Sequence, residues 1–456
     1  MKKYDVIVIG GGPAGYSAAE RLAELKKSVC IVETDENRVG GTCLNEGCIP
    51  VKSLLEAAEV YDNVKNAFRF GISAKAEPPD MKKIRGFAEK NVLHLRSSLF
   101  SFLKGRGVDF VFGRASFTSK HEIEVAKEKG GSEKLEADYF VIATGSKAKE
   151  LPALAPDGKY ICNSSELLKT GLPADKILIV GGGYIGCEFA TFYSRMDSKV
   201  TVVEMREQIL PGEDGDVARA LSGELAKSGV EIFTEGEIVS AAKKGSKIET
   251  VIKLRGKADE KVFEFDRALV CAGRVPDISG LALEKIGVET EKGFIKVDKQ
   301  MKTSVPNVYA AGDVVNTPLL ASVAYGEGKA AAESIAGFEG SPFDYSAVPR
   351  VVFTSPQVGC IGMTEKEAKQ KGLEVKIIRK FFKANAKAFI TGRNAGFAKI
   401  IFDEKSHRLL GAAMLGPFAG ELIHLLSRAV LEKITVEKAL DIIYAHPTLS
   451  EILKNG

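Results

Sequence analysis

Short apolar runs alternate with helix-like stretches along most of the chain, and two of these alternations share one layout. Residues 6–9 form an apolar run that leads into a glycine-rich turn, a helical stretch and a second apolar run ending at Glu33. Residues 177–180 begin the same succession, which ends at Glu204. Each acidic residue follows the first glycine of its turn by the same distance, 33 − 10 = 23 and 204 − 181 = 23. The pattern predicts two βαβ units of one kind.

The glycines of the two turns have the spacing that a dinucleotide requires. The first glycine allows a tight turn, the second lets a pyrophosphate approach the backbone, and the third lets helix and strand pack closely. The start of the helix then holds the phosphates. One such motif could be only a tight turn, but two matching copies favour nucleotide binding. The positions are Gly10, Gly12 and Gly15 in the first unit, and Gly181, Gly183 and Gly186 in the second.

The acidic residue at the end of each second strand selects the nucleotide. A carboxylate there accepts hydrogen bonds from a ribose 2′-hydroxyl and repels a 2′-phosphate. Glu204 therefore favours NAD over NADP.

The remaining pattern divides the chain into three parts. Apolar runs end at Thr144-Gly145, at Gly273 and at Asp313, as strand ends facing a cofactor would. The last ~115 residues mix short strands (399–402 and 411–415) with helices such as 421–432, which is typical of an α+β module and suggests subunit contact. We expect an α/β protein with two Rossmann-like dinucleotide-binding domains and a C-terminal α+β dimerisation domain. The expected boundaries are 1–148 with 273–342, 149–272, and 343–456.

Composition narrows the class of protein. The 456 residues include 64 Lys and Arg against 60 Asp and Glu, and a net charge of +4 gives no case for nucleic acid or an anionic membrane. No apolar stretch approaches the ~20 residues of a membrane helix, so we expect a soluble protein. Five of the seven cysteines are scattered and fit buried thiols in a reducing cytosol. A small-molecule or protein substrate is the expectation.

Cys43 and Cys48 are close enough in sequence to need a joint explanation. Five residues of ideal helix would set their Cα atoms about 7.5 Å apart, whereas a disulfide needs about 4.4–6.8 Å. The pair can close only where the backbone leaves the helix, and Gly47 and Pro50 permit such a departure. An accessible, constrained pair suits redox catalysis. Metal binding is the alternative, but the segment lacks a second Cys or His cluster at ligand spacing, so no metal site is predicted.

One dipolar and one cationic feature could stabilise a thiolate at the pair. They are the start of the following helix and Lys52, one turn after Cys48. A solvated surface lysine is the alternative reading of Lys52.

Five motifs together resemble the pyridine nucleotide-disulfide oxidoreductases, over essentially the whole chain. They are GGTCLNEGCIPVKSLL around the cysteines, GGGYIGCE, CAGRVP, VYAAGDV and the C-terminal YAHPTLSE. Within this family the segment GAAMLGPFAGELIH is most similar to the branch that oxidises dihydrolipoyl groups. The resemblance implies that electrons pass from a dihydrolipoyl group through Cys43 and Cys48 to FAD and then to NAD⁺.

The resemblance also implies which residues hold the cofactors. For FAD these are Gly10, Gly12, Gly15, Glu33, Thr42, Lys52, the backbone near Ala115, Thr144, Gly145, Ser146, Asp313, Leu320 and Ala321. For NAD they are Gly181, Gly183, Gly186, Glu204 and Gly273, while Glu188 would pair with Lys52 beside the flavin. The first domain would accordingly bind FAD and the second NAD.

A proton carrier is also needed, because a dithiol must lose protons to form a disulfide and histidine titrates near neutrality. Among the five histidines, His446 stands out because Pro447 should start a helix and Glu451 follows one turn later, where it could orient the ring. For His94, His121, His407 and His424 we expect no partner. In the family the pair His446 and Glu451 would reach the cysteines of a second subunit, which implies a homodimer.

Four positions depart from the commonest family pattern: Glu46, Val51, Ser322 and Tyr444. None removes a catalytic group, but they leave open the redox potential and the shape of the substrate mouth. The expected partner is a lipoyl-bearing protein of a 2-oxo acid dehydrogenase or glycine cleavage complex. Another NAD(P)H-dependent flavoprotein disulfide reductase, a diaphorase, and a non-catalytic complex subunit are the alternatives.

Overall fold

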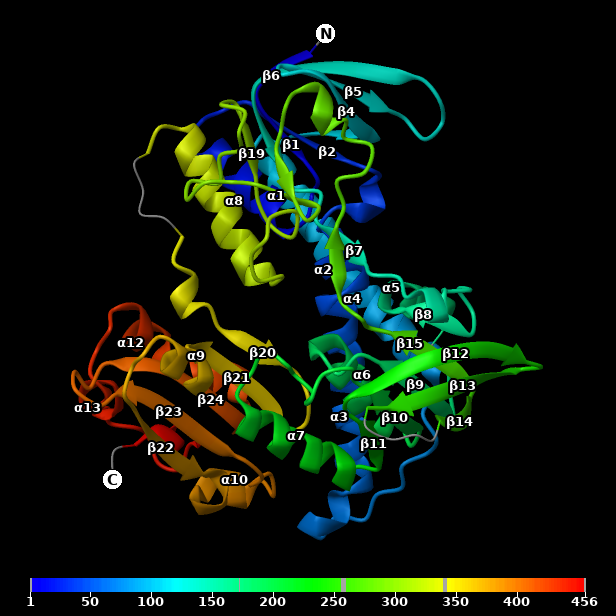
Figure 1. Cartoon of the computed structure of the whole chain (residues 1–456), viewed down its shortest axis with the longest axis vertical. Coiled ribbons are helices and arrows are strands. Elements are labelled where there is room, and N and C mark those ends of the chain that lie inside the picture. The colour runs from blue at the N-terminus through cyan, green and yellow to red at the C-terminus, as the bar shows by residue number, and fades with distance from the viewer. Residues whose placement is uncertain (1, 172, 256–259, 339–342, 455–456) are drawn as a thin grey trace. The chain divides into compact units, whose positions relative to one another are not determined.

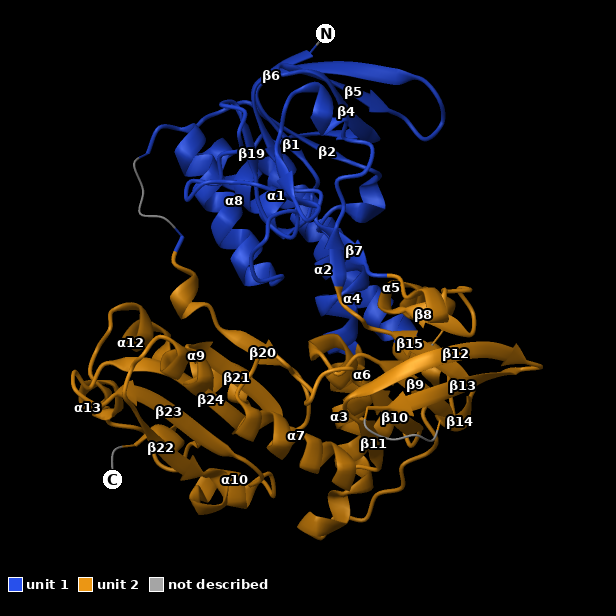
Figure 2. Ribbon diagram, in the orientation of Figure 1, with its two compact units in different colours: residues 1–53, 85–149, 274–343 blue, residues 54–84, 150–273, 344–456 orange. Residues whose placement is uncertain are grey.

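The computed structural model describes residues 2–171, 173–255, 260–338 and 343–454. The chain forms two compact units, each assembled from three segments (Figure 2). Unit 1 comprises residues 1–53, 85–149 and 274–343, and unit 2 comprises residues 54–84, 150–273 and 344–456. Two of the boundaries fall inside helices, in α3 (Cys48–Lys65) and α4 (Met81–Gly105).

A largely parallel sheet forms the centre of unit 1 (Figure 1). Among the described residues its strand order is β3-β2-β1-β6-β5-β4, with β19 also paired to β6. Val6 and Val8 of β1 belong to one hydrophobic cluster and Ile7 and Ile9 to another, so both faces are buried, as is usual for parallel strands. The strands are β1 (Lys2–Ile9), β2 (Val29–Glu33), β3 (Asp109–Phe112), β4 (Arg114–Ser119), β5 (Glu122–Ala126), β6 (Ser132–Ile142) and β19 (Val308–Ala310).

Helices α1 (Pro13–Glu24) and α8 (Ala321–Ile335) pack against each other and against this sheet (Figure 1). Their contact is close, since a Cβ atom added at Gly328 would lie 2.2 Å from the carbonyl oxygen of Ala14. Small residues on both helices therefore fix the position of the start of α1, which carries the first glycine turn.

Unit 2 contains a second parallel sheet of order β11-β10-β9-β15-β8. Helix α6 (Tyr184–Arg195) joins β9 to β10, and α7 (Gly215–Lys227) precedes β11. An antiparallel sheet of β12, β13 and β14 is inserted before β15. The strands are β8 (Ile161–Asn163), β9 (Lys176–Val180), β10 (Lys199–Val203), β11 (Val230–Phe233), β12 (Gly236–Lys244), β13 (Lys247–Leu254), β14 (Glu260–Phe265) and β15 (Arg267–Val270).

The C-terminal part of unit 2 is built on an antiparallel sheet of order β20-β21-β24-β23-β22. The strands are β20 (Arg350–Val352), β21 (Gln357–Gly362), β22 (Val375–Phe381), β23 (Phe397–Asp403) and β24 (Leu409–Gly416). The expected helix over 421–432 is wrong as a continuous element. It is divided into α11 (Ala419–Leu422), the 3-10 helix η7 (Ile423–Leu426) and α12 (Ser427–Leu431).

The predicted fold class is confirmed: two parallel βαβ sheets are accompanied by a C-terminal α+β module. The remaining helices are α2 (Gly41–Glu46), α5 (Ser164–Thr170), α9 (Glu365–Gln370), α10 (Ala386–Ile390) and α13 (Val436–Leu440). The remaining strands are β7 (Ser146–Ala148), β16 (Arg274–Pro276), β17 (Thr290–Glu291) and β18 (Phe294–Ile295). The 3-10 helices include η1 (Glu36–Arg38), η2 (Ala67–Phe70), η3 (Pro152–Leu154), η4 (Leu283–Lys285), η5 (Tyr345–Ala347), η6 (Phe382–Ala384) and η8 (Leu449–Leu453).

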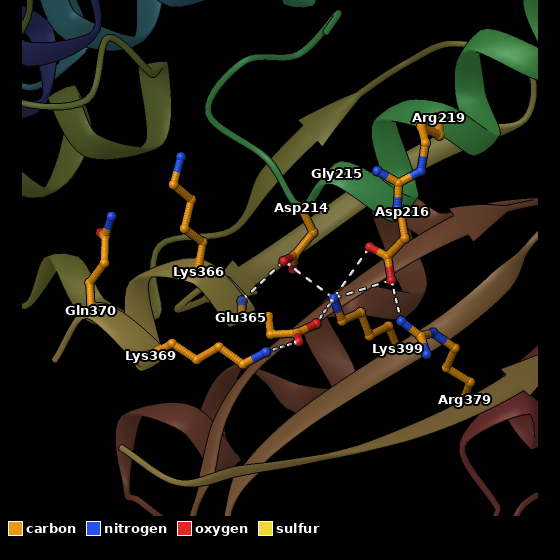
Figure 3. A pocket seen from close by; sticks show the side chains of 10 residues that line it. All are labelled: Asp214, Gly215, Asp216, Arg219, Glu365, Lys366, Lys369, Gln370, Arg379 and Lys399. Atoms are coloured by element: carbon orange, nitrogen blue, oxygen red, sulfur yellow. Dashed lines mark hydrogen bonds and ion pairs between the residues drawn. The ribbon is translucent and has the colours of Figure 1, made fainter. Parts of the chain in front are cut away.

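A buried lysine links the start of α7 in unit 2 to the C-terminal sheet of the same unit (Figure 3). Lys399 of β23 is 1% exposed, and its Nζ lies 3.2 Å from Asp214, 3.2 Å from Asp216 and 2.9 Å from Glu365. Burial alone lowers the pKa of Lys399, but the hydrogen bond to Glu365 and the charges of both aspartates outweigh it and raise the pKa above its usual value. These groups line a hollow of about 540 Å³.

Replacing Lys399 with methionine is expected to lower the free energy of unfolding by about 3–5 kcal/mol, because three carboxylates would lose their buried counter-charge. Urea denaturation followed by circular dichroism measures the change. Lys369→Met is the matched control: this lysine pairs with Glu365 at 2.6 Å but is 61% exposed, so a change within about 0.5 kcal/mol is expected. Equal losses in the two variants would contradict a structural role for the buried charge.

Candidate active site

Cys43 and Cys48 form a disulfide in unit 1, with their Cα atoms 4.8 Å apart. The helix is interrupted between them, since α2 (Gly41–Glu46) ends before Gly47 and α3 (Cys48–Lys65) begins after it. The expected departure from helix therefore occurs at Gly47, while Pro50 lies in the first turn of α3. The predicted redox disulfide is confirmed.

Position 47 has no room for a side chain larger than that of glycine. A Cβ atom at this position would lie 2.9 Å from the carbonyl oxygen of Thr42 and 3.2 Å from the Cα of Cys43. Both neighbours are backbone atoms, which cannot rotate away as a flexible side chain could.

Gly47→Ala is expected to destabilise the loop by about 1–3 kcal/mol through overpacking, and to lower the fraction of Cys43–Cys48 disulfide in a defined thiol buffer. Thiol counting by alkylation and mass spectrometry measures that fraction. Gly86→Ala is the control, because nothing lies within 4 Å of a Cβ atom at this site in α4 and alanine favours helix. An unchanged disulfide fraction in Gly47→Ala would contradict the need for glycine at this position.

The first glycine turn has the geometry of a phosphate cradle. Gly10 has a φ of 104°, and a Cβ atom at Gly15 would lie 1.8 Å from the carbonyl oxygen of Gly10. Gly12 is the N-cap of α1 and provides no side-chain cap, so the first N–H groups of the helix stay available for an anion.

A second helix start meets this turn. A Cβ atom at Gly41 would lie 2.6 Å from the Cα of Gly12, so the N-termini of α2 and α1 converge, and neither has a side-chain cap. Glu33 accepts hydrogen bonds from Gly11 N at 2.9 Å and from Thr34 N at 2.6 Å. The carboxylate is thereby fixed beside the turn.

The turn in unit 2 repeats this geometry. Gly181 has a φ of 109°, a Cβ atom at Gly186 would lie 1.9 Å from the carbonyl oxygen of Gly181, and Gly183 is the uncapped N-cap of α6. Glu204 accepts hydrogen bonds from Gly182 N at 2.7 Å and from Arg206 N at 2.8 Å, and it is 6% exposed. The duplication seen in the sequence is thus a duplication of backbone and carboxylate geometry.

Three distant segments of unit 1 meet at the carboxyl ends of β6 and β19. Ser146 Oγ donates to Asp313 Oδ2 at 2.5 Å, and Arg274 Nε donates to Ser146 Oγ at 2.7 Å. Burial lowers the pKa of Arg274, and the charge of Asp313 partly opposes this. Thr144 Oγ1 donates to the carbonyl oxygen of Asp277 at 2.7 Å. Ser146 and Asp313, both predicted, are therefore brought together, and Arg274 of the CAGRVP motif joins them.

His446 and Glu451 are held together as predicted in unit 2. His446 Nδ1 lies 3.0 Å from Oε1 and 3.2 Å from Oε2 of Glu451, and the histidine side chain is 73% exposed. Two hydrogen bonds lower the pKa of Glu451: the larger effect comes from Thr448 N and the smaller from the His446 side chain. The expected helix start at Pro447 is wrong, because Thr448 caps the 3-10 helix η8 (Leu449–Leu453) instead. Nδ1 is thus the ring nitrogen that faces Glu451.

The other predicted positions lie on elements already described. Glu188 on α6 is 4% exposed and accepts a hydrogen bond from Phe353 N at 3.1 Å. Gly145 and Gly273 have φ angles of 75° and 106°. Thr42 is on α2, Lys52 on α3 and Ala115 on β4, while Leu320 is the N-cap of α8 and Ala321 its first residue.

Residues 4–328 match the family described as pyridine nucleotide-disulphide oxidoreductase, and residues 348–456 match its dimerisation domain. The chain belongs to this family. It is 40% identical to dihydrolipoyl dehydrogenase of Thermus scotoductus, over 99% of this chain and 96% of that protein. It is 39% identical to dihydrolipoyl dehydrogenase of Bacillus subtilis, over 98% and 96% of the two chains. The crystal structure of LpdA from Mycobacterium tuberculosis is similar with a TM-score of 0.91 and 27% identity, over 99% of this chain and 98% of that one.

Membership of the pyridine nucleotide-disulphide oxidoreductases confirms the predicted enzyme class and its cofactors, FAD and NAD. The residues of this chain fit both groups: each glycine turn presents uncapped helix N–H groups for phosphates, and each has a fixed carboxylate beside it. The match to the dimerisation domain supports a homodimer.

Two histidines have partners that the sequence did not predict. His407 Nδ1 lies 2.5 Å from Glu437, and His121 Nδ1 lies 3.2 Å from the carbonyl oxygen of Ala137. The expectation that they lack partners is wrong, because both contacts join residues from different elements. Both histidines are far in sequence from Cys43 and Cys48.

The described residues form neither a metal-binding cluster nor a membrane-spanning helix. Within the ranges given above, no group of three or more His, Cys, Asp or Glu side chains is arranged to hold a metal ion. Likewise, none of the helices described is both long and apolar enough to cross a membrane.

Proposed function

We propose that the chain is a dihydrolipoyl dehydrogenase, which oxidises a dihydrolipoyl dithiol and reduces NAD⁺: dihydrolipoyl plus NAD⁺ gives lipoyl disulfide, NADH and a proton. The observation that carries this proposal is the closed Cys43–Cys48 pair, in a chain 40% identical to a dihydrolipoyl dehydrogenase over almost its full length.

The pair would act by two thiol–disulfide exchanges. A dihydrolipoyl thiolate attacks Cys43 Sγ, the Cys43–Cys48 bond breaks, and Cys48 leaves as a thiolate. The second sulfur of the substrate then displaces Cys43, so that lipoyl disulfide departs and both cysteines are reduced. FAD held at the glycine turn of unit 1 would supply the two-electron chemistry that links the reduced cysteine pair to NAD⁺.

His446 would accept a proton from the attacking thiol, and Glu451 would orient its ring and stabilise the imidazolium. In the homodimer this pair would serve the cysteines of the other subunit. Cys43 and Cys48 are therefore proposed as the exchange pair, and His446 with Glu451 as the proton carrier.

Glycine turns and carboxylates would hold the two nucleotides. The FAD residues proposed are Gly10, Gly12, Gly15, Glu33, Thr42, Lys52, Ala115, Thr144, Gly145, Ser146, Asp313, Leu320 and Ala321. The NAD residues proposed are Gly181, Gly183, Gly186, Glu188, Glu204 and Gly273. The corresponding domains are 1–148 with 273–342 for FAD, 149–272 for NAD and 343–456 for the interface, and the boundary at 342 lies outside the described residues.

The proposed partner is a lipoyl-bearing protein of a 2-oxo acid dehydrogenase or glycine cleavage complex, and the proposed location is the cytoplasm. Four of the five free cysteines are buried, and burial raises the thiol pKa of all five, as suits inert thiols in a reducing compartment. The cytoplasm maintains such conditions.

Anaerobic turnover of dihydrolipoamide with NAD⁺ or NADP⁺ tests the proposal. We expect rapid reduction of NAD⁺, weak reduction of NADP⁺ because Glu204 repels a 2′-phosphate, and no activity with glutathione. Preference for glutathione would favour another disulfide reductase, and preference for NADP⁺ would overturn the interpretation of Glu204.

A further inference from the structure

Glu46 places a charge inside the loop that the disulfide closes. It is the last residue of α2, three positions after Cys43 on the same helix. Residues at this spacing are neighbours on a helix surface, with Cβ atoms about 5–6 Å apart. Glu46 is also two residues from Cys48, so their Cα atoms can be at most about 7 Å apart. The backbone thus places the Glu46 side chain beside that of Cys43 on α2 and two residues before Cys48.

An ion pair with Arg38 fixes this carboxylate. The Glu46 side chain is 12% exposed and contacts Arg38 Nη1, whose side chain is 34% exposed. Arg38 is the last residue of η1, immediately before the glycine turn of α2. Burial lowers the pKa of Arg274, and the charges of Asp313 and Glu46 partly oppose this lowering. Glu46 therefore contacts Arg38 and acts electrostatically on Arg274.

The residue next to Glu46 is fixed as well. Asn45 Nδ2 donates to the carbonyl oxygens of Val39 at 3.0 Å and Gly41 at 2.9 Å, and its Oδ1 accepts from Arg96 Nη1 at 3.2 Å. These bonds of Asn45 hold the backbone next to Glu46 in place, while the ion pair with Arg38 holds the carboxylate.

The two charges act in opposite directions on a thiolate. When the disulfide accepts two electrons from a dithiol, its S–S bond breaks and the substrate S–S bond forms. Of the two protons released by the dithiol, one stays on a cysteine thiol and one passes to His446 of the partner subunit, which leaves one cysteine as a thiolate. A nearby carboxylate disfavours that thiolate and a nearby guanidinium favours it.

We propose that the Arg38–Glu46 ion pair sets the acidity of the Cys43 thiol in the reduced enzyme, with Arg38 cancelling the repulsion that Glu46 exerts on the thiolate. Arg38 and Glu46 are positioning residues that act through charge. The inference rests on the proposed function only in that Cys43 must be a redox thiol.

Four proteins measure the charge effect: the wild type, Arg38→Met, Glu46→Gln and the double variant. Each holoenzyme is reduced anaerobically, and the rate of Cys43 alkylation by iodoacetamide is followed against pH by mass spectrometry. We expect Arg38→Met to raise the apparent pKa of Cys43 by about one unit and Glu46→Gln to lower it by about one unit. The double variant should return close to the wild-type value, because both charges are gone.

Two sets of controls separate charge from structure. Arg38→Lys keeps the charge and should keep the wild-type pKa, and Arg38→Gln replaces Arg38→Met if the latter loses FAD. Lys134→Met and Glu122→Gln break an ion pair of 3.0 Å elsewhere in unit 1 and should not move the pKa of Cys43. Single variants that shift the pKa in the same direction, or that leave it unchanged, would overturn the inference.

The measurement is independent of turnover with dihydrolipoamide. If the wild type fails to oxidise dihydrolipoamide but the opposite shifts are seen, the proposed substrate is wrong and the role of the ion pair stands. If turnover is normal and the shifts are absent, the ion pair has no such role while the proposed function stands.

Discussion

Exchanging Cys43 for serine is expected to lower the oxidation of dihydrolipoamide by about 10⁴-fold or more, because a hydroxyl cannot form the mixed disulfide through which electrons enter. The substitution removes one sulfur from the Cys43–Cys48 bond and changes little else in volume. FAD content should be retained, since the proposed phosphate-binding turn is formed by backbone at Gly12 and Gly41 rather than by the substituted sulfur. Steady-state rates with NAD⁺ and the flavin absorbance of the purified protein give both quantities.

Cys162→Ser is the matched control for this experiment. Cys162 is a buried free cysteine of β8 and its thiol pKa is raised by burial, so its loss should leave turnover within about twofold. Undiminished lipoamide turnover in Cys43→Ser would refute the dithiol mechanism.

Replacing His446 with glutamine is expected to lower lipoamide turnover by about 10²–10⁴-fold, the usual contribution of a general acid–base group. Glutamine keeps a polar side chain near Glu451 but cannot carry a proton between thiols. Electron transfer from NADH to an artificial acceptor should be retained, because it bypasses the exchange pair. Stopped-flow measurement of both half-reactions separates these effects.

Two further variants define the role of this histidine. Glu451→Gln should cause a smaller loss, since the imidazole remains but the imidazolium loses its counter-charge at 3.0 Å. His424→Gln, in the same C-terminal module, should have no effect. A His446→Gln enzyme with wild-type lipoamide turnover would show that the proton leaves by another route.

The fold and the glycine turns could be predicted because their determinants are local. Gly15 and Gly186 each face the carbonyl oxygen of the first glycine of their own turn, at 1.8 Å and 1.9 Å from the position of a Cβ atom. A contact within six residues leaves a fixed spacing in the sequence. The disulfide loop follows the same rule, because Gly47 avoids backbone atoms of Thr42 and Cys43.

Contacts between distant segments could not be predicted, because they leave no fixed spacing in the sequence. Lys399 lies in an apolar strand, yet its partners Asp216 and Glu365 are 183 and 34 residues away. Arg274 meets Ser146 across 128 residues, and His407 meets Glu437 across 30. Each residue alone is consistent with an ordinary surface charge. Their pairing follows from the packing of elements, which a single sequence does not display.

One measurement tests the path of the electrons most directly. The oxidised holoenzyme is mixed anaerobically with one equivalent of dihydrolipoamide in the absence of NAD⁺, and new thiols are trapped with iodoacetamide and located by mass spectrometry. We predict two new thiols per subunit, on Cys43 and Cys48, with lipoamide released in equal amount. The mixture is quenched over a time course, and reduction of the flavin before any thiol on Cys43 or Cys48 can be trapped would contradict the account.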